Sequence, residues 1–121
     1  MKVIIDLIED IRTEISNDAA YTMSAMLLKD DPDNSEKLLY AGERALTDFE
    51  IDHGAKKLLF KIKQESQTLL IGDLVKHLLI LDMDAMMYPL QIAVNQQYQE
   101  LAVIGFGKSE EDNKYILFIK I

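Results

Sequence analysis

The side chains that could carry acid–base chemistry lie in one stretch of the sequence, residues 70–90. His77 follows Asp73 by four positions, and on a helix this spacing lets a carboxylate hold an imidazole in place for proton transfer. Asp84 stands shortly after them. A pocket bounded by Asp73, His77 and Asp84 would suit a small-ligand-binding protein or an enzyme, whereas a surface ion pair is the plainer interpretation. No nucleophile or second histidine stands near His77, so we assign no catalytic residue.

The residues that metal ions and cofactors use are scarce. The chain has no cysteine and two histidines, His53 and His77, which rules out thiolate sites and makes a poor zinc set. Residues 31–36 place oxygen-bearing side chains as a calcium loop does, but Glu36 and Gly42 stand where that loop requires glycine and a bidentate acid. We therefore expect no metal site and no cofactor.

Charge and hydropathy narrow the class of partner. The formal net charge is −8, from 21 acidic and 13 basic residues, and such a balance repels the phosphates of nucleic acids. No apolar stretch reaches the roughly 18 residues of a membrane helix, and Asp6 interrupts the first apolar run too early for a secretory signal. We expect a cytoplasmic protein that binds neither nucleic acid nor membrane, and that prefers a basic protein partner.

Hydrophobic periodicity predicts a single domain of helices and strands. Apolar residues spaced by three and four indicate a helix over residues 3–16, and a second helix is predicted over residues 72–81. Alternation predicts strands over residues 21–28, 57–63, 87–94, 98–106 and 114–121. Residues 38–51 are compatible with a helix, but the alternation of their second part favours a strand with a bulge at Gly42.

The order helix, strand, strand, strand occurs twice. Residues 6–8 (Asp-Leu-Ile) match residues 73–75 (Asp-Leu-Val), and Ala45 and Phe49 stand 57 positions before Ala102 and Phe106. We therefore expect an α+β fold of two tandem αβββ units, residues 1–66 and 67–121, forming a mainly antiparallel sheet covered by two helices. Convergent patterning without duplication is the alternative, and whether the units form one sheet or two is open.

The second unit resembles a small module of uncharacterised bacterial and phage proteins. In that module a helix of pattern GELIxxL is followed by Asp-Ala, an apolar residue and then strands. Here residues 72–75 (Gly-Asp-Leu-Val) match the start of the helix pattern, and residues 84–86 (Asp-Ala-Met) match the segment that follows it. The match is short, and the Met-rich residues 83–87 depart from it where a β-branched residue is usual. The resemblance implies a fold and no active site.

The second helix is apolar around more of its circumference than the first. Leu79 and Ile80 extend its apolar surface beyond one stripe, whereas the first helix is polar in the corresponding region. Such a helix needs a second surface to bury against, and flexible methionines suit either an irregular core or an adaptable binding surface. We predict an interface, against the alternative of an intramolecular core, at Leu79, Ile80, Met83, Met86 and Met87.

Two kinds of function follow. The first is a small acidic, non-enzymatic protein-interaction module of inhibitor or immunity type, which is expected to mask a basic surface and to pair with itself as a homodimer. The second is a small-ligand-binding protein or enzyme with a pocket between the two units near His77.

Overall fold

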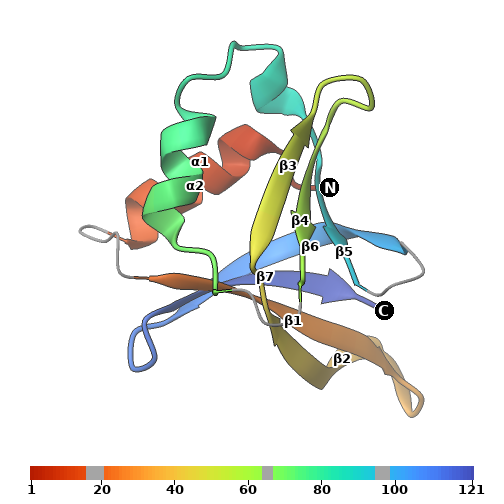
Figure 1. Cartoon of the computed structure of the whole chain (residues 1–121). Helices are drawn as coiled ribbons and strands as arrows, with labels where there is room; N and C mark the ends of the chain where they lie inside the picture. The colour runs from red at the N-terminus through yellow and green to blue at the C-terminus, as the bar shows by residue number, and fades with distance from the viewer. Residues whose placement is uncertain (16–20, 64–66, 95–98) are drawn as a thin grey trace.

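The computed structural model describes residues 1–15, 21–63, 67–94 and 99–121. Within these ranges the chain forms two α-helices, one short 3-10 helix and a seven-stranded mixed sheet (Figure 1). The elements are α1 (Ile4–Glu14), β1 (Thr22–Asp31), β2 (Asn34–Ala45), β3 (Asp48–Asp52), β4 (Lys57–Lys61), α2 (Ile71–Leu78), η1 (Ala85–Met87), β5 (Leu90–Ala93), β6 (Glu100–Ser109) and β7 (Lys114–Lys120). The predicted α+β class is confirmed. Tyr98, where one strand was predicted to begin, lies outside the described residues.

The helices form where the apolar spacing predicts them, and α2 is shorter than expected. In α1 the stripe of Ile4, Leu7, Ile8 and Ile11 is buried, and the Asp6 carboxylate accepts the Val3 N–H at 3.0 Å to cap the first turn. The predicted helix over 72–81 ends at Leu78. The Asp82 carboxylate accepts the N–H of Ala85 instead, at 2.8 Å, which favours a turn over a further helical turn.

Residues 38–51 are strand, but they belong to two strands rather than one. Gly42 has φ +136° beside a register shift between Leu27 and Leu28, so the predicted bulge is confirmed. The strand then ends at Ala45, and β3 begins at Asp48. Between them Leu46 is fully buried; its N–H donates to Met23 and its carbonyl accepts from Leu69, at 2.9 and 2.7 Å. The first αβββ unit therefore has four strands, not three.

The strands of the two sequence halves, residues 1–66 and 67–121, interleave in one sheet. The order is β2-β1-β7-β6-β5-β4-β3, so the three strands of the second half lie between those of the first. The pairs that join the halves, β1 with β7 and β4 with β5, are parallel, and the other four pairs are antiparallel. The sheet is therefore mixed rather than antiparallel throughout, because the first strand of each half pairs in parallel with the last strand of the other.

The same register recurs at the two junctions. Met23 pairs with Tyr115 at one junction and Leu90 pairs with Leu58 at the other. Leu90 stands 67 positions after Met23, and Leu58 stands 57 positions before Tyr115. Outside the sheet, the Ile4 N–H donates to Tyr88 and the Ile71 N–H to Tyr21, both at 3.0 Å. The donors Ile4 and Ile71 are 67 positions apart, and so are the acceptors Tyr21 and Tyr88. Each half therefore donates this hydrogen bond to the equivalent tyrosine of the other half.

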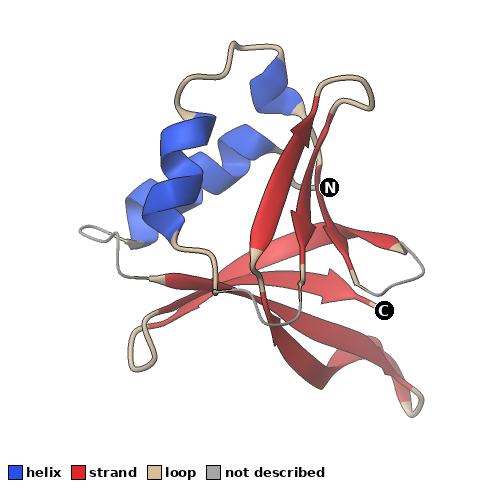
Figure 2. Cartoon of the chain, in the orientation of Figure 1, coloured by secondary structure: helices blue, strands red, loops and turns tan. Residues whose placement is uncertain are grey.

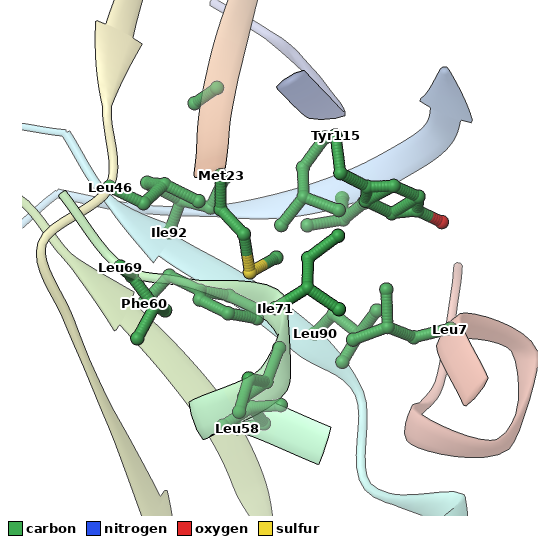
Figure 3. Packing of buried hydrophobic residues seen from close by; sticks show 14 of the residues in the cluster. Leu7, Met23, Leu46, Leu58, Phe60, Leu69, Ile71, Leu90, Ile92 and Tyr115 are labelled. Atoms are coloured by element: carbon green, nitrogen blue, oxygen red, sulfur yellow. The ribbon is translucent and has the colours of Figure 1, made fainter. Parts of the chain in front are cut away.

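One continuous core lies between the helices and the side of the sheet that they cover. Figure 2 shows α1 and α2 on the same side of the bent sheet. Side chains from that side of β1, β4, β5 and β7 meet those of the helices, as Figure 3 shows for Met23, Phe60, Leu90 and Tyr115. All four are fully buried. None of the described helices has both the length and the apolar content needed to cross a bilayer.

Because each half supplies the neighbours of the other half's strands, we expect the whole chain to unfold as one cooperative unit. Thermal unfolding followed by far-ultraviolet circular dichroism and by tyrosine fluorescence should give coincident transitions. Two separate transitions, with one half still folded between them, would contradict the interleaved sheet.

Candidate functional site

His77 lies on the exposed side of α2 and contacts the backbone of Asp73. Its Nδ1 atom is 2.8 Å from the Asp73 carbonyl oxygen, and because a carbonyl oxygen only accepts, Nδ1 carries the proton in this contact. The imidazole also meets the Phe49 ring edge to face, with the centroids 5.3 Å apart. His77 thus donates to the main-chain carbonyl of Asp73 and not to the Asp73 carboxylate, which acid–base chemistry would use.

Asp84 lies elsewhere, at a surface hollow of about 530 Å³. The hollow is lined by Lys56, Asp82, Asp84, Met87, Tyr88 and Pro89. His77 and Asp73 are not among the residues that line this hollow.

A contact that the sequence did not indicate adjoins the hollow. His53 Nδ1 lies 3.0 Å from the Tyr88 hydroxyl oxygen, and the two rings meet edge to face with centroids 5.6 Å apart. The pair joins the β3–β4 turn to the residue after η1. No spacing pattern could have linked two residues 35 positions apart.

The segment from the end of α2 to η1 exposes large apolar side chains. Leu79, Ile80, Met83 and Met87 have exposed fractions of 54%, 82%, 86% and 63%, and we call these four residues the α2–η1 surface. Met86, the fifth residue of the predicted interface, is half-buried and packs against the core. Neighbouring residues of a tight helical turn point to different sides, so Met86 turns inward while Met87 faces out.

Two carboxylates stand beside the α2–η1 surface. Asp82 and Asp84 are exposed and line the hollow, and Met87 belongs to both the hollow and the surface. Lys56, with a left-handed φ of 56° in the β3–β4 turn, contributes one opposing charge. The apolar surface therefore continues into a concave region with more acidic than basic groups.

A second hollow, of about 270 Å³, lies beside α1, and two of its three acids have structural roles. It is lined by Lys2, Asp6, Glu9, Asp10, Thr13 and Phe106. Asp6 caps α1, and Asp10 accepts a hydrogen bond of 2.5 Å from the hydroxyl of Tyr115. Lys2 Nζ lies 5.6 Å from the centre of the Phe106 ring. Among the described residues, no three His, Cys, Asp or Glu side chains are placed to hold a metal ion.

The buried Tyr115 hydroxyl predicts a loss of stability at alkaline pH. Burial, together with the hydrogen bond to Asp10, raises the pKa of Tyr115 far above its ordinary value of 10.0. Above pH 10 the unfolded chain loses this proton while the folded chain keeps it, so the free energy of unfolding should fall by up to about 1.4 kcal/mol per pH unit. Urea unfolding between pH 9 and 11 measures this slope. Tyr115→Phe should be less steep; equal slopes would contradict the assignment.

A comparison of the chain with protein-family models, curated proteins and solved structures finds no match. The resemblance of the second half to a phage and bacterial module therefore stays a prediction.

Proposed function

We propose that the protein is a non-enzymatic protein-interaction module that binds a basic partner protein through the α2–η1 surface. The observation that carries this proposal is the exposure of Leu79, Ile80, Met83 and Met87, each more than half exposed within nine consecutive residues. Clustered apolar exposure of this kind marks interaction sites, whereas single exposed apolar residues are ordinary.

The composition of the surface suits a protein partner. Burying apolar area is favourable by about 25 cal/mol per Å², so side chains as exposed as Ile80 and Met83 have much to gain from a partner. The flexible thioethers of Met83 and Met87 can adapt to the shape of the surface they meet. An apolar ridge of a partner protein would supply the matching contact.

The charges around the surface favour a basic partner over a second copy of the chain. Asp82 and Asp84 line the hollow that Met87 shares with the α2–η1 surface, so a lysine or arginine next to the partner's apolar ridge could enter it. A second copy would bring like carboxylates together here. The net charge of −8 would also steer a basic protein toward the chain.

Only the second half of the chain, residues 67–121, carries the α2–η1 surface, and the equivalent part of the first half is polar. We infer that the halves arose by duplication, and the recurring register at offsets of 67 and 57 supports this inference. At an offset of 67, Leu79 and Ile80 correspond to Arg12 and Thr13 of α1, which are exposed and polar. The apolar surface is then a feature added to one copy of a common scaffold. A cytoplasmic location remains part of this proposal, resting on the composition.

A small-ligand-binding or enzymatic role remains the second candidate, and the hollow of about 530 Å³ is the observation in its favour. A ligand bound there would contact Asp84, Tyr88 and Lys56 rather than His77. Tyr88→Phe would then weaken ligand binding and leave protein binding at Ile80 unchanged, which separates the two functions.

A pair of synthetic helical peptides tests the proposed function. One carries leucines on one face and lysines on the other, and its control replaces every lysine by glutamate. We expect the lysine peptide to bind with micromolar affinity in calorimetric titrations, and more weakly as salt screens the attraction. Equal binding of both peptides, or binding that strengthens with salt, would refute a surface selective for basic partners.

A further inference from the structure

No described helix covers the side of the sheet opposite α1 and α2 (Figure 2). Apolar residues lie on this side. Leu28 pairs with Tyr40, and Met26 pairs with Phe118. Directly paired residues point to the same side of a sheet, and these alternate with the core residues of β1. The group consists of Met26, Leu28, Leu38, Tyr40 and Phe118, which we call the outer face. Tyr40 is 64% exposed and Leu38 40% exposed.

Two glycines on β6 make room for the ring of Phe118. Gly105 pairs with Phe118, and Gly107 stands two residues further along β6 on the same side. A Cβ atom on Gly107 would lie 2.9 Å from the Phe118 ring, closer than packed atoms allow. The ring therefore rests on the bare backbone of β6. An apolar group on one side of a sheet suits the packing of one sheet on another.

Two pairs of opposite charges lie on the outer face. Lys114 pairs with Glu43 at 2.8 Å, and Lys120 pairs with Asp30 at 3.0 Å. These side chains stand on the same side of the sheet as Met26 and Leu28. In the strand register Glu43 lies opposite Met26 and Lys120 lies opposite Leu28. The surplus of acids that makes the net charge −8 therefore lies outside these pairs. These four charges are already neutralised by one another, so they offer little attraction to a strongly charged partner.

We propose that the outer face binds a second copy of this chain, with the two sheets packed face to face about a twofold axis. The twofold places Tyr40 and Phe118 of one copy over the same apolar group of the other, and the ion pairs fall around them. Like-charged chains meet with least repulsion where each surface is neutral. Pairing through the edge of β2 is disfavoured, because its bulge at Gly42 interrupts the strand.

Salt distinguishes this contact from binding at the α2–η1 surface. Each copy carries a charge of −8, so screening lowers the repulsion between copies and should strengthen the dimer. Binding of a basic partner should weaken under the same change. The two proposals therefore predict opposite responses, and either can fail without the other.

Sedimentation equilibrium on the full chain tests the dimer at about 0.05 M and about 0.5 M sodium chloride. We expect a monomer–dimer equilibrium in the micromolar range that tightens at the higher salt. Tyr40→Ser should weaken it at least about tenfold, because an aromatic anchor is lost without a change of charge. Ile80→Ser, an uncharged truncation at another exposed residue, is the matched control and should leave it unchanged. Leu38→Ser provides a second variant should Tyr40→Ser fail to fold.

Three results would overturn the proposal. The first is a chain that stays monomeric at both salt concentrations up to several hundred micromolar. The second is a dimer that Tyr40→Ser and Leu38→Ser leave intact while circular dichroism shows both variants folded. The third is a dimer that Ile80→Ser dissociates, which would place self-association at the α2–η1 surface.

Discussion

Replacing Ile80 by serine is expected to weaken binding of the leucine–lysine peptide about tenfold or more. Ile80 is 82% exposed in the free chain, and full burial of an isoleucine side chain stabilises a complex by about 1.5–3 kcal/mol. Serine removes this gain without altering the charge, so the salt dependence of the remaining affinity should be unchanged. Calorimetric titration of both chains with the same peptide measures the difference.

The effect should come from binding alone, because the side chain supports little of the fold. Truncation of an exposed residue changes the free energy of unfolding by about 0.5 kcal/mol or less, and urea unfolding checks this. Adding Met83→Ser should weaken binding further, since Met83 is 86% exposed in the same surface. Tyr40→Ser is the control on the outer face and should bind the peptide as the unmodified chain does. A tenfold loss with Tyr40→Ser and none with Ile80→Ser would move the binding site.

Replacing Phe60 by alanine is expected to lower the free energy of unfolding by about 3–5 kcal/mol. Phe60 is fully buried among the core residues of β4, β5 and the helices, so alanine removes apolar contacts and leaves a cavity. Because the free energy of unfolding of domains of this size is only about 5–15 kcal/mol, this substitution would remove a large part of it. The midpoint of urea unfolding should fall accordingly, with an unchanged slope.

Phe118→Ala is the matched control, since it removes the same side chain from the opposite side of the sheet. Phe118 is half-buried and lies over Gly105 and Gly107, so its truncation opens a surface depression rather than an enclosed cavity. We expect a clearly smaller loss than for Phe60→Ala. Equal losses would contradict a single core on the helix side.

The features that the sequence predicted correctly are those with local causes. The stripe from Ile4 to Ile11 has a helical period, and Gly42 supplies the positive φ that the bulge requires. Leu79 and Ile80 follow the end of α2 rather than lying on it, and they are exposed in the structure; their role as an interface stays a prediction. Each of these inferences depends on residues within a few positions of one another.

The features that the sequence missed depend on contacts between distant segments. Alternation runs unbroken through Ala45, Thr47 and Phe49, yet the strand breaks there because Leu46 is buried against Met23 and Leu69. The parallel pairs of the two halves, and the hydrogen bond between His53 and Tyr88, likewise have no local signature. Asp84 was grouped with Asp73 and His77 because the three are close in sequence. The turn after α2 places Asp84 at a hollow that neither Asp73 nor His77 lines.

The methionine methyl groups provide the most direct test of the central claim, that the α2–η1 surface binds a basic protein partner. The six methionines sample different parts of the molecule: Met83 and Met87 lie on this surface, Met23 is in the core and Met26 is on the outer face. In a methyl NMR titration with the leucine–lysine peptide, we expect the resonances of Met83 and Met87 to shift while those of Met23 and Met26 stay in place. Shifts of Met26 without Met83 and Met87 would contradict it.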